Sequence, residues 1–256
     1  MRKSKVLQKL REGNLVSCFK VNTCDPAVVE IAAMAGFDCV WTDLEHVPND
    51  WSVIKNQVMA AKVNDADLMV RVARGSYSDY IKPFELDAAG IMIPHVMSCK
   101  QAGDIVKITR FHPAGRRPID GGNADGAYSQ MPLDRYIKHS NNHKFVMIQI
   151  EDPESVEELD TIAAVSGIDM LFFGALDFSH SIGAPGERDN PDVREAMKKV
   201  AEAARANGKF AGAAANKKNL DDIVNMGYKF IKIGADVAGL WDYCEELSGL
   251  FDEHKP

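Results

Sequence analysis

The seven residues FVMIQIE, at positions 145–151, form an almost continuous apolar run that ends in an acid. Runs of this kind are typical of strands that are buried on both faces of a parallel sheet. Asp152-Pro153 follows at once, and an N-cap residue followed by proline commonly opens a helix. The stretch therefore predicts a strand followed directly by a helix, the unit from which parallel α/β folds are built.

The same pattern of strand and then helix recurs along the chain on both sides of this stretch. Short apolar runs predict strands at residues 15–21, 39–43, 68–72, 91–94, 145–151, 170–174, 210–213 and 230–234. Helical patterns are found at residues 26–36, 51–63, 80–88, 98–108, from 153 onward, 191–207 and 237–250. Eight such units predict a (β/α)8, or TIM, barrel better than any open sheet of similar length.

Length and composition are compatible with this barrel. The chain has 256 residues, of which 46% are hydrophobic and 26% charged, which excludes a disordered or collagen-like protein. The length suits either one α/β barrel or two small domains. Because the eight units use the whole chain, we expect a single domain spanning residues 1–256.

The charge and the cysteines narrow the class of protein further. The formal net charge of -7 argues against a nucleic-acid surface, which needs clustered Lys and Arg. No apolar run approaches the ~20 residues that cross a bilayer, and the basic start MRKSKVLQKLREGN lacks the apolar core of a signal peptide. Five cysteines without CxxC spacing favour neither a disulfide framework nor a zinc site. We therefore expect a cytoplasmic protein that acts on a small molecule.

One long segment, residues 109–132, interrupts the regular pattern. It is rich in Gly, Pro, Asn and Asp, too polar for a core and too long for an ordinary connection. We expect it to be functional or to contact another subunit. The large apolar side chains elsewhere, such as Trp41, Phe172 and Trp241, are expected to pack in the core.

Polar side chains interrupt the ends of several predicted strands, where the active sites of (β/α)8 barrels lie. Glu151 ends the fifth strand and Asp177 follows the sixth, so their carboxylates can share one ion. Two carboxylates whose remaining positions are left to water and substrate suit Mg²⁺ or Mn²⁺. The alternative is that each acid caps the helix that follows it.

Two further side chains near strand ends are candidates for chemistry. Arg71, in the apolar run LMVRV, must pair with an anion, so it either binds substrate or forms a buried salt bridge with Asp43 or Glu45. His46 follows the second strand and can act as a general base at neutral pH, or it is an ordinary surface histidine.

Together these segments resemble a known family in order and over nearly the whole chain. The segments are TDLEH (42–46), LMVRV (68–72), FELDAAGIMIPHV (84–96), TRFHPAGRR (109–117), IQIED (148–152), FFGALDFSHSIG (172–183) and KIGAD (232–236). They are similar to the HpcH/HpaI family of class II pyruvate aldolases. The resemblance implies a metal-dependent (β/α)8 enzyme that cleaves 4-hydroxy-2-oxo acids to pyruvate and an aldehyde, such as a semialdehyde or hydroxyaldehyde, or joins them.

The resemblance also implies roles for particular residues and an assembly. Glu151 and Asp177 fall on the ligands of a Mg²⁺, Mn²⁺ or Co²⁺ ion, Arg71 on the transition-state arginine, and His46 on the base whose basicity Asp87 raises. Substrate-binding positions fall on Gln149, Gly174 and Leu176. Asp43, counted with the catalytic residues, and Arg117, counted with the substrate-binding ones, fall near a subunit boundary. Members form hexamers, or trimers of dimers, by exchanging C-terminal helices.

The chain departs from the family pattern at two positions that bear on the site. Leu176 stands where the family has the alanine of Gly-Pro-Ala-Asp, so a larger side chain is expected near the pyruvate methyl group. Pro118 replaces a flexible glycine after Arg117, so we expect a different path for that loop.

Three other functions stay open on the sequence. A class I aldolase would form a Schiff base on Lys20 or Lys232, although each is more simply an ion-paired lysine. A non-catalytic oligomer that binds oxo acids would keep the barrel without turnover. An acyl-CoA lyase of the citrate lyase β type fits less well, because TDLEH matches the aldolase branch.

Overall fold

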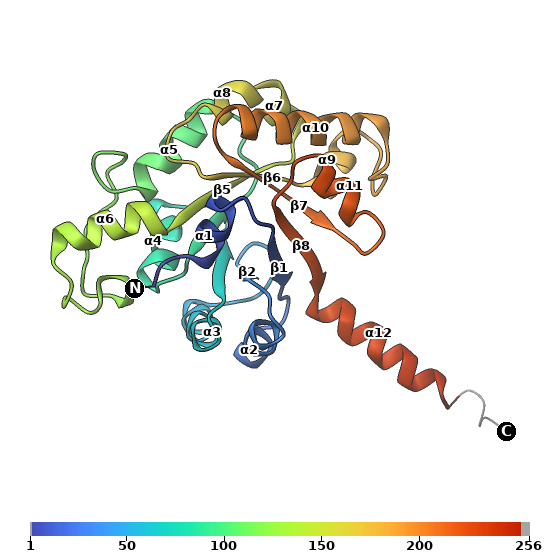
Figure 1. The fold of residues 1–256 in the computed structure, drawn as a ribbon, viewed down its shortest axis with the longest axis horizontal. Coiled ribbons are helices and arrows are strands. Elements are labelled where there is room, and N and C mark those ends of the chain that lie inside the picture. The colour runs from blue at the N-terminus through green and yellow to red at the C-terminus, as the bar shows by residue number, and fades with distance from the viewer. Residues whose placement is uncertain (1, 252–256) are drawn as a thin grey trace.

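The computed structural model describes residues 2–251 and shows a closed barrel of parallel strands surrounded by helices (Figure 1). The strands pair in chain order, and β1 closes the barrel against β8. They are β1 (Val16–Lys20), β2 (Cys39–Asp43), β3 (Asp67–Arg71), β4 (Gly90–Ile93), β5 (Phe145–Ile150), β6 (Met170–Phe173), β7 (Phe210–Ala215) and β8 (Phe230–Ala235). The predicted (β/α)8 barrel is confirmed, and all eight strands lie within about two residues of their predicted positions.

Alternate residues of each strand divide between two apolar layers, as the pleat of a strand requires. One layer fills the barrel interior and contains Cys18, Cys39, Met69, Met92, Met147, Met170, Phe172 and Phe230. The other lies between strands and helices and contains Val40, Val70, Ile91, Ile148, Leu171 and Ile231. Both faces of the sheet are therefore apolar, which is why these strands read as continuous apolar runs in the sequence.

The helices cover the outside of the barrel. They are α1 (Lys5–Arg11), α2 (Pro26–Met34), α3 (Trp51–Val63), α4 (Tyr77–Glu85), α5 (Cys99–Thr109), α6 (Leu133–His143), α7 (Pro153–Glu157), α8 (Leu159–Ala163), α9 (Ala175–Ser181), α10 (Pro191–Ala206), α11 (Leu220–Asn225) and α12 (Asp236–Gly249). Asp25 caps α2 as its position before a proline predicts, since its carboxylate accepts a 2.9 Å bond from the backbone N–H of Ala27. The sequence analysis missed α1, α6, α9 and α11.

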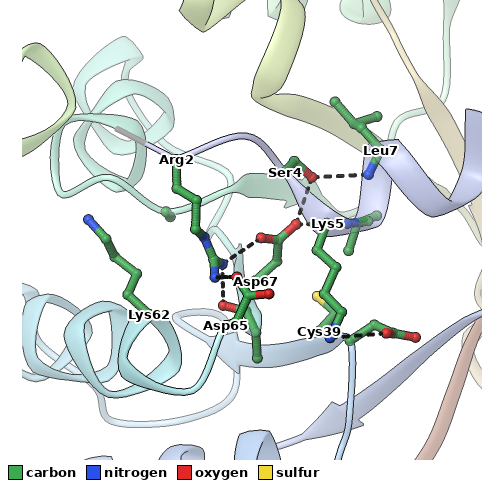
Figure 2. Close-up of polar contacts among 12 residues, drawn as sticks. Arg2, Ser4, Lys5, Leu7, Cys39, Lys62, Asp65 and Asp67 are labelled. Carbon is green, nitrogen blue, oxygen red and sulfur yellow. Dashed lines mark hydrogen bonds and ion pairs between the residues drawn. The ribbon is translucent and has the colours of Figure 1, made fainter.

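The missed helix α1 closes the N-terminal end of the barrel. Its Val6, Leu7 and Leu10 belong to the apolar cluster of the barrel interior. Figure 2 shows how the residues before α1 are held. The carboxylate of Asp67, at the start of β3, accepts hydrogen bonds from Ser4 Oγ (2.6 Å) and Arg2 Nη2 (2.8 Å). This end of the barrel is thus filled by the chain itself, which leaves the opposite end for a site.

The segment at residues 109–132 is not a wholly polar excursion, and in this respect the prediction was wrong. Phe111, Arg117 and Asp125 are buried, and Asp125 accepts a 2.7 Å bond from the hydroxyl of the buried Tyr136. A short 3-10 turn (Ala124–Gly126) lies within the segment. The buried charges of Arg117 and Asp125 lie 2.9 Å apart and pair with each other. Because the pairing offsets the cost of burying them, this polar segment can fold against the barrel.

The last helix, α12, leads away from the barrel at the end of β8 (Figure 1). None of its residues is buried. Trp241 was predicted to pack in the core, and this prediction was wrong, since the residue is 68% exposed. None of the helices in residues 2–251 is long and apolar enough to span a bilayer.

Candidate active site

A cavity of about 280 Å³ opens at the C-terminal ends of the strands. The predicted site residues that line it are His46, Arg71, Gln149, Gly174, Leu176 and Asp177, and the other lining residues include Lys20, Trp41, Phe172, Arg188 and Lys232. This is the end of a (β/α)8 barrel at which active sites lie. Strand ends that are far apart in the sequence are therefore brought together in one concave site.

Glu151, directly after β5, is almost completely buried, at 1% exposure. Gln149 Nε2 donates to its Oε2 at 2.6 Å, and the backbone N–H of His95 donates to its Oε1 at 2.9 Å. Both oxygens are thus oriented by donors from β5 and from the loop after β4. The pKa of Glu151 is raised to about 7, chiefly by burial; the backbone N–H and the ring of His95 oppose this rise, and the nearby carboxylates of Asp177 and Glu45 add to it.

Gly174 lets the sixth strand approach this carboxylate closely. A Cβ atom at position 174 would lie 2.4 Å from Glu151 Oε2, so a side chain there is excluded. The next residues begin α9, and Asp177 lies in its first turn on the wall of the cavity. Because Gly174 has no side chain, the backbone just before α9 can lie next to Glu151. Asp177 is then near enough to affect the pKa of Glu151.

The donor set fits a divalent cation of the Mg²⁺ or Mn²⁺ type in part. Glu151 and Asp177 supply two carboxylates, and the side-chain oxygen Oε1 of Gln149 is buried without a hydrogen-bond partner among the described residues. Within residues 2–251, no three His, Cys, Asp or Glu side chains form a metal-binding cluster. An ion held by the two carboxylates would thus keep several positions for water and substrate, as Mg²⁺ does in catalytic sites.

Arg71, at the end of β3, forms the buried salt bridge that was one of the two alternatives and also reaches the cavity. Its Nε and Nη2 donate to the two carboxylate oxygens of Asp43 at 3.0 and 2.5 Å, and Nε lies 3.1 Å from Glu45 Oε2. Its side chain also lines the cavity. The buried salt bridge therefore holds the guanidinium in a fixed orientation beside the space for a ligand.

Asp43 itself is fully buried and does not line the cavity. Burial alone raises the pKa of Asp43, but its bonds with Arg71 and the charge of Lys20 outweigh this and lower the pKa. Asp43 is therefore an ionised partner that positions Arg71. Its catalytic role stays a prediction, and within the subunit Asp43 could act only through Arg71.

His46 lies at the mouth of the cavity with 60% of its side chain exposed, and its Nε2 is 3.7 Å from Glu45 Oε2. A second histidine at this end was missed. His95, in the left-handed region at φ 51°, bonds through Nδ1 to Asp152 at 3.0 Å and lies 3.6 Å from Glu151. Burial lowers the pKa of His95, but Asp152, Glu151 and Glu45 outweigh this and raise it. The sequence signal that could have identified His95 was its place directly after the fourth predicted strand.

The two lysines considered for a Schiff base both line the cavity. Lys20 Nζ lies 3.1 Å from Asp43 Oδ2, so it is ion-paired. Burial and the charge of Lys20 lower the pKa of Lys232. Lys232 is therefore the lysine of the two whose surroundings favour the neutral amine.

Two of the residues assigned through the family resemblance lie elsewhere in the subunit. Asp87 precedes β4 at the N-terminal end of the barrel, where its carboxylate pairs with Lys62 and Lys144, so within one chain it cannot act on His46. Arg117 is buried against Asp125 and over the ring of Phe111, away from the cavity. Their roles beside the substrate are not supported within the subunit.

Comparisons with known proteins agree with the fold and identify a family. The family model described as HpcH/HpaI aldolase/citrate lyase matches residues 17–242. A hydroxypyruvate/pyruvate aldolase of Pseudomonas aeruginosa is 30% identical over 97% of this chain and 93% of its own length. A 2-keto-3-deoxy-L-rhamnonate aldolase of Klebsiella pneumoniae is 30% identical over 82% of this chain and 78% of its own. The crystal structure of an HpcH/HpaI aldolase from Desulfitobacterium hafniense superposes with a TM-score of 0.92 at 28% identity, covering 98% of this chain and 97% of the other.

Proposed function

The chain belongs to the HpcH/HpaI aldolase/citrate lyase family and is a carbon–carbon lyase, and we propose that it is a class II aldolase that cleaves or forms 4-hydroxy-2-oxo acids. The observation that carries this proposal is that Asp177, Gln149 and Arg71 line one cavity, while the carboxylate of Glu151 lies behind Gln149, which donates to it at 2.6 Å. The products of cleavage are pyruvate, through its enolate, and an aldehyde such as a semialdehyde or hydroxyaldehyde.

Each side chain has a task that its surroundings support. Arg71, held by Asp43, directs positive charge at the oxygen on which the enolate charge develops; a comparable donor contributes about 3 kcal/mol to transition states. Gln149 and the backbone around Gly174 and Leu176 hold the pyruvate part. His46, exposed at the mouth, accepts the proton of the 4-hydroxyl group during cleavage and returns it during addition.

Glu151 and Asp177 would hold the divalent cation, Mg²⁺, Mn²⁺ or Co²⁺. When bound, such a cation acts as a Lewis acid for the keto oxygen of the substrate. The raised pKa of Glu151 means that a cation must compete with a proton for this carboxylate near pH 7, so cation binding should weaken as the pH falls below about 7.

The test is turnover of a 4-hydroxy-2-oxo acid by protein treated with a chelator and then reloaded with Mn²⁺ or Mg²⁺. The proposal requires activity to disappear with chelation and return with the ion. Exchange of the methyl protons of pyruvate, followed by NMR, gives a second readout that needs no particular aldehyde. Absence of exchange with metal present, while pyruvate still raises the melting temperature, would leave a binding protein without turnover.

A class I mechanism is the alternative that one observation favours, namely the lowered pKa of Lys232 in the cavity. Borohydride in the presence of pyruvate would trap the adduct on Lys232, and activity would then survive the chelator. Saturable cleavage of a CoA ester would instead support the citrate lyase β type of reaction.

We also propose that the subunits assemble through α12 and that the protein is cytoplasmic. The exposed apolar side chains of α12 support exchange of this helix between subunits of a hexamer or trimer of dimers; they are Val237, Leu240, Trp241, Tyr243 and Leu247. All five cysteines are free thiols, which suits a reducing compartment.

A further inference from the structure

His95 joins the loop after β4 to the residues that follow β5. Its backbone N–H donates to Glu151 Oε1 at 2.9 Å, and its ring Nδ1 donates to Asp152 Oδ2 at 3.0 Å. These two acids are consecutive, and Asp152 is the residue from which α7 begins. One residue of a neighbouring loop therefore holds both the buried carboxylate of Glu151 and the residue next to it.

The backbone of His95 adopts a conformation that side chains make unfavourable. Its φ is 51°, in the left-handed region, where residues other than glycine are uncommon. Its neighbours Pro94 and Val96 are buried, so the strained residue lies between two fixed positions. Strain of this kind persists only where the surroundings over-determine the conformation. In this conformation the N–H and the ring of His95 both reach the end of β5.

The partner of the ring is itself fixed. Asp152 is the N-cap of α7, and its backbone N–H donates to the Oγ of the buried Ser155 at 3.3 Å. The bond from His95 Nδ1 therefore ends on a residue that a helix holds in place. Carboxylates that bind metal ions are commonly oriented by hydrogen bonds from residues that do not touch the ion.

The ring of His95 lies beside the active-site cavity and not on its wall. It lines a separate cavity of about 130 Å³ together with Tyr80 and Gln101, and the described residues that line the active-site cavity do not include it. Its Nε2 lies 3.9 Å from Glu45 Oε1, which is too far for a hydrogen bond. His95 is therefore placed to act on Glu151 and not on a substrate.

We propose that His95 is a positioning residue, whose Nδ1 bond to Asp152 keeps its backbone N–H on Glu151 and so keeps this carboxylate oriented for the divalent cation. The inference rests on the proposed function, because it takes Glu151 as a ligand of that cation. Gln149 donates to the other oxygen, Oε2, at 2.6 Å. The two donors together fix the carboxylate, and without His95 one of them is lost.

The affinity for Mn²⁺, followed by electron paramagnetic resonance of the free ion, tests this role without turnover. An asparagine amide reaches about as far as Nδ1 and tolerates the left-handed region, whereas a glutamine amide reaches about as far as Nε2. We expect His95→Gln and His95→Ala to weaken Mn²⁺ binding by at least about tenfold, the usual cost of losing such an orienting residue. His95→Asn should bind Mn²⁺ nearly as tightly as the wild type.

The control is His143→Gln, at a half-buried histidine just before β5 and so at the opposite end of the barrel, which should leave the affinity unchanged. Melting temperatures verify that each variant is folded. A double-mutant cycle of His95→Ala with Asp152→Ala should give losses of affinity that do not add, because both substitutions remove the same bond.

Wild-type Mn²⁺ affinity in folded His95→Gln would overturn the inference, as would an asparagine variant as weak as the alanine variant, or additive losses in the cycle. If the affinity depends on His95 as expected while no 4-hydroxy-2-oxo acid is cleaved, the proposed function fails and the positioning role stands. If turnover needs Mn²⁺ but the His95 variants bind the ion like the wild type, the positioning role fails and the aldolase stands.

Discussion

At the scale of single residues, the exposed Asp177 lines the cavity, is near enough to Glu151 to affect its pKa, and makes no side-chain hydrogen bond or ion pair with residues 2–251. Replacing it with asparagine removes one of two anionic cation ligands while keeping its shape. We predict that Asp177→Asn lowers kcat by at least about 100-fold, since Lewis-acid stabilisation is worth several kcal/mol. The melting temperature should stay near that of the wild type. Asp189→Asn, on the exposed loop nearby, is the matched control and should retain activity.

The surroundings of Asp87 support a prediction about the stability of the fold, not about catalysis. Burial would raise the pKa of Asp87, but Lys144 and Lys62 outweigh it and lower the pKa below its ordinary value. A depressed folded-state pKa gives stability that is present above the unfolded pKa near 4 and lost as pH falls through the folded value. Asp87→Asn leaves Lys144 buried without its partner, so the free energy of unfolding at pH 7 should drop by about 3 kcal/mol.

Urea unfolding of Asp87→Asn and wild type from pH 7 downward measures this effect. The difference between the two proteins should shrink as the pH falls below 4. Asp104→Asn is the control, because Asp104 pairs with Lys100 on the exposed surface of α5 and should contribute less than about 1 kcal/mol. A pH-independent difference would mean that the charge of Asp87 is not what stabilises this end of the barrel.

These residues also show where sequence reasoning reaches its limit. Glu151, Asp177 and Arg71 follow or end strands, so the periodicity that predicts the strands also predicts that they meet at one end. Asp87 precedes a strand, and the same rule places it at the opposite end; only the family resemblance suggested otherwise. His95 was missed although it follows the fourth predicted strand, because its contacts with Glu151 and Asp152 join loops that only the folded barrel brings together.

At the scale of elements, the turn from β6 into α9 sets the size of the site. Leu176, 50% exposed, lines the cavity where the family pattern has alanine. We predict that Leu176→Ala raises kcat/KM for 2-oxobutyrate relative to pyruvate by about tenfold, because one methylene in an apolar pocket is worth 10–200-fold. Competition between the two donors in one assay measures the ratio. Leu133→Ala, on a leucine of α6 with 52% exposure and away from the cavity, should leave the ratio unchanged.

The helices that were predicted and those that were missed differ in their apolar pattern. α10 buries seven residues, and its apolar side chains repeat at helical spacing. α6 buries only Tyr136 and Ser140, so its sequence LDRYIKHSNNH carries little periodic signal. α1 and α9 are short, and their burial depends on the closed barrel. Local sequence therefore predicts helices with a long apolar stripe and misses helices that are short or bury few residues.

At the scale of the whole molecule, α12 has no buried residue within the part of the chain that the structure describes. We predict that wild-type protein is an oligomer in solution and that Leu240→Asp combined with Trp241→Asp shifts its mass toward the monomer. Light scattering coupled to size exclusion measures the mass, and circular dichroism checks that the barrel stays folded. Leu133→Asp, on the equally exposed surface of α6, is the control. A monomeric wild type would contradict the proposed exchange of α12.

The pairing of β1 with β8 has a consequence for how the chain is made. Val16 pairs with Phe230 and Ser17 with Ile231. One edge of the first strand to be synthesised therefore cannot pair until the last strand has been made. During translation β1 and the growing edge of the sheet stay unpaired, and contacts between distant parts of the chain slow folding. Until β8 is released, Lys20 and Lys232 cannot face one another. The side of the cavity lined by Lys20 and Lys232 is therefore the last part of the site to form, after the side lined by Gln149.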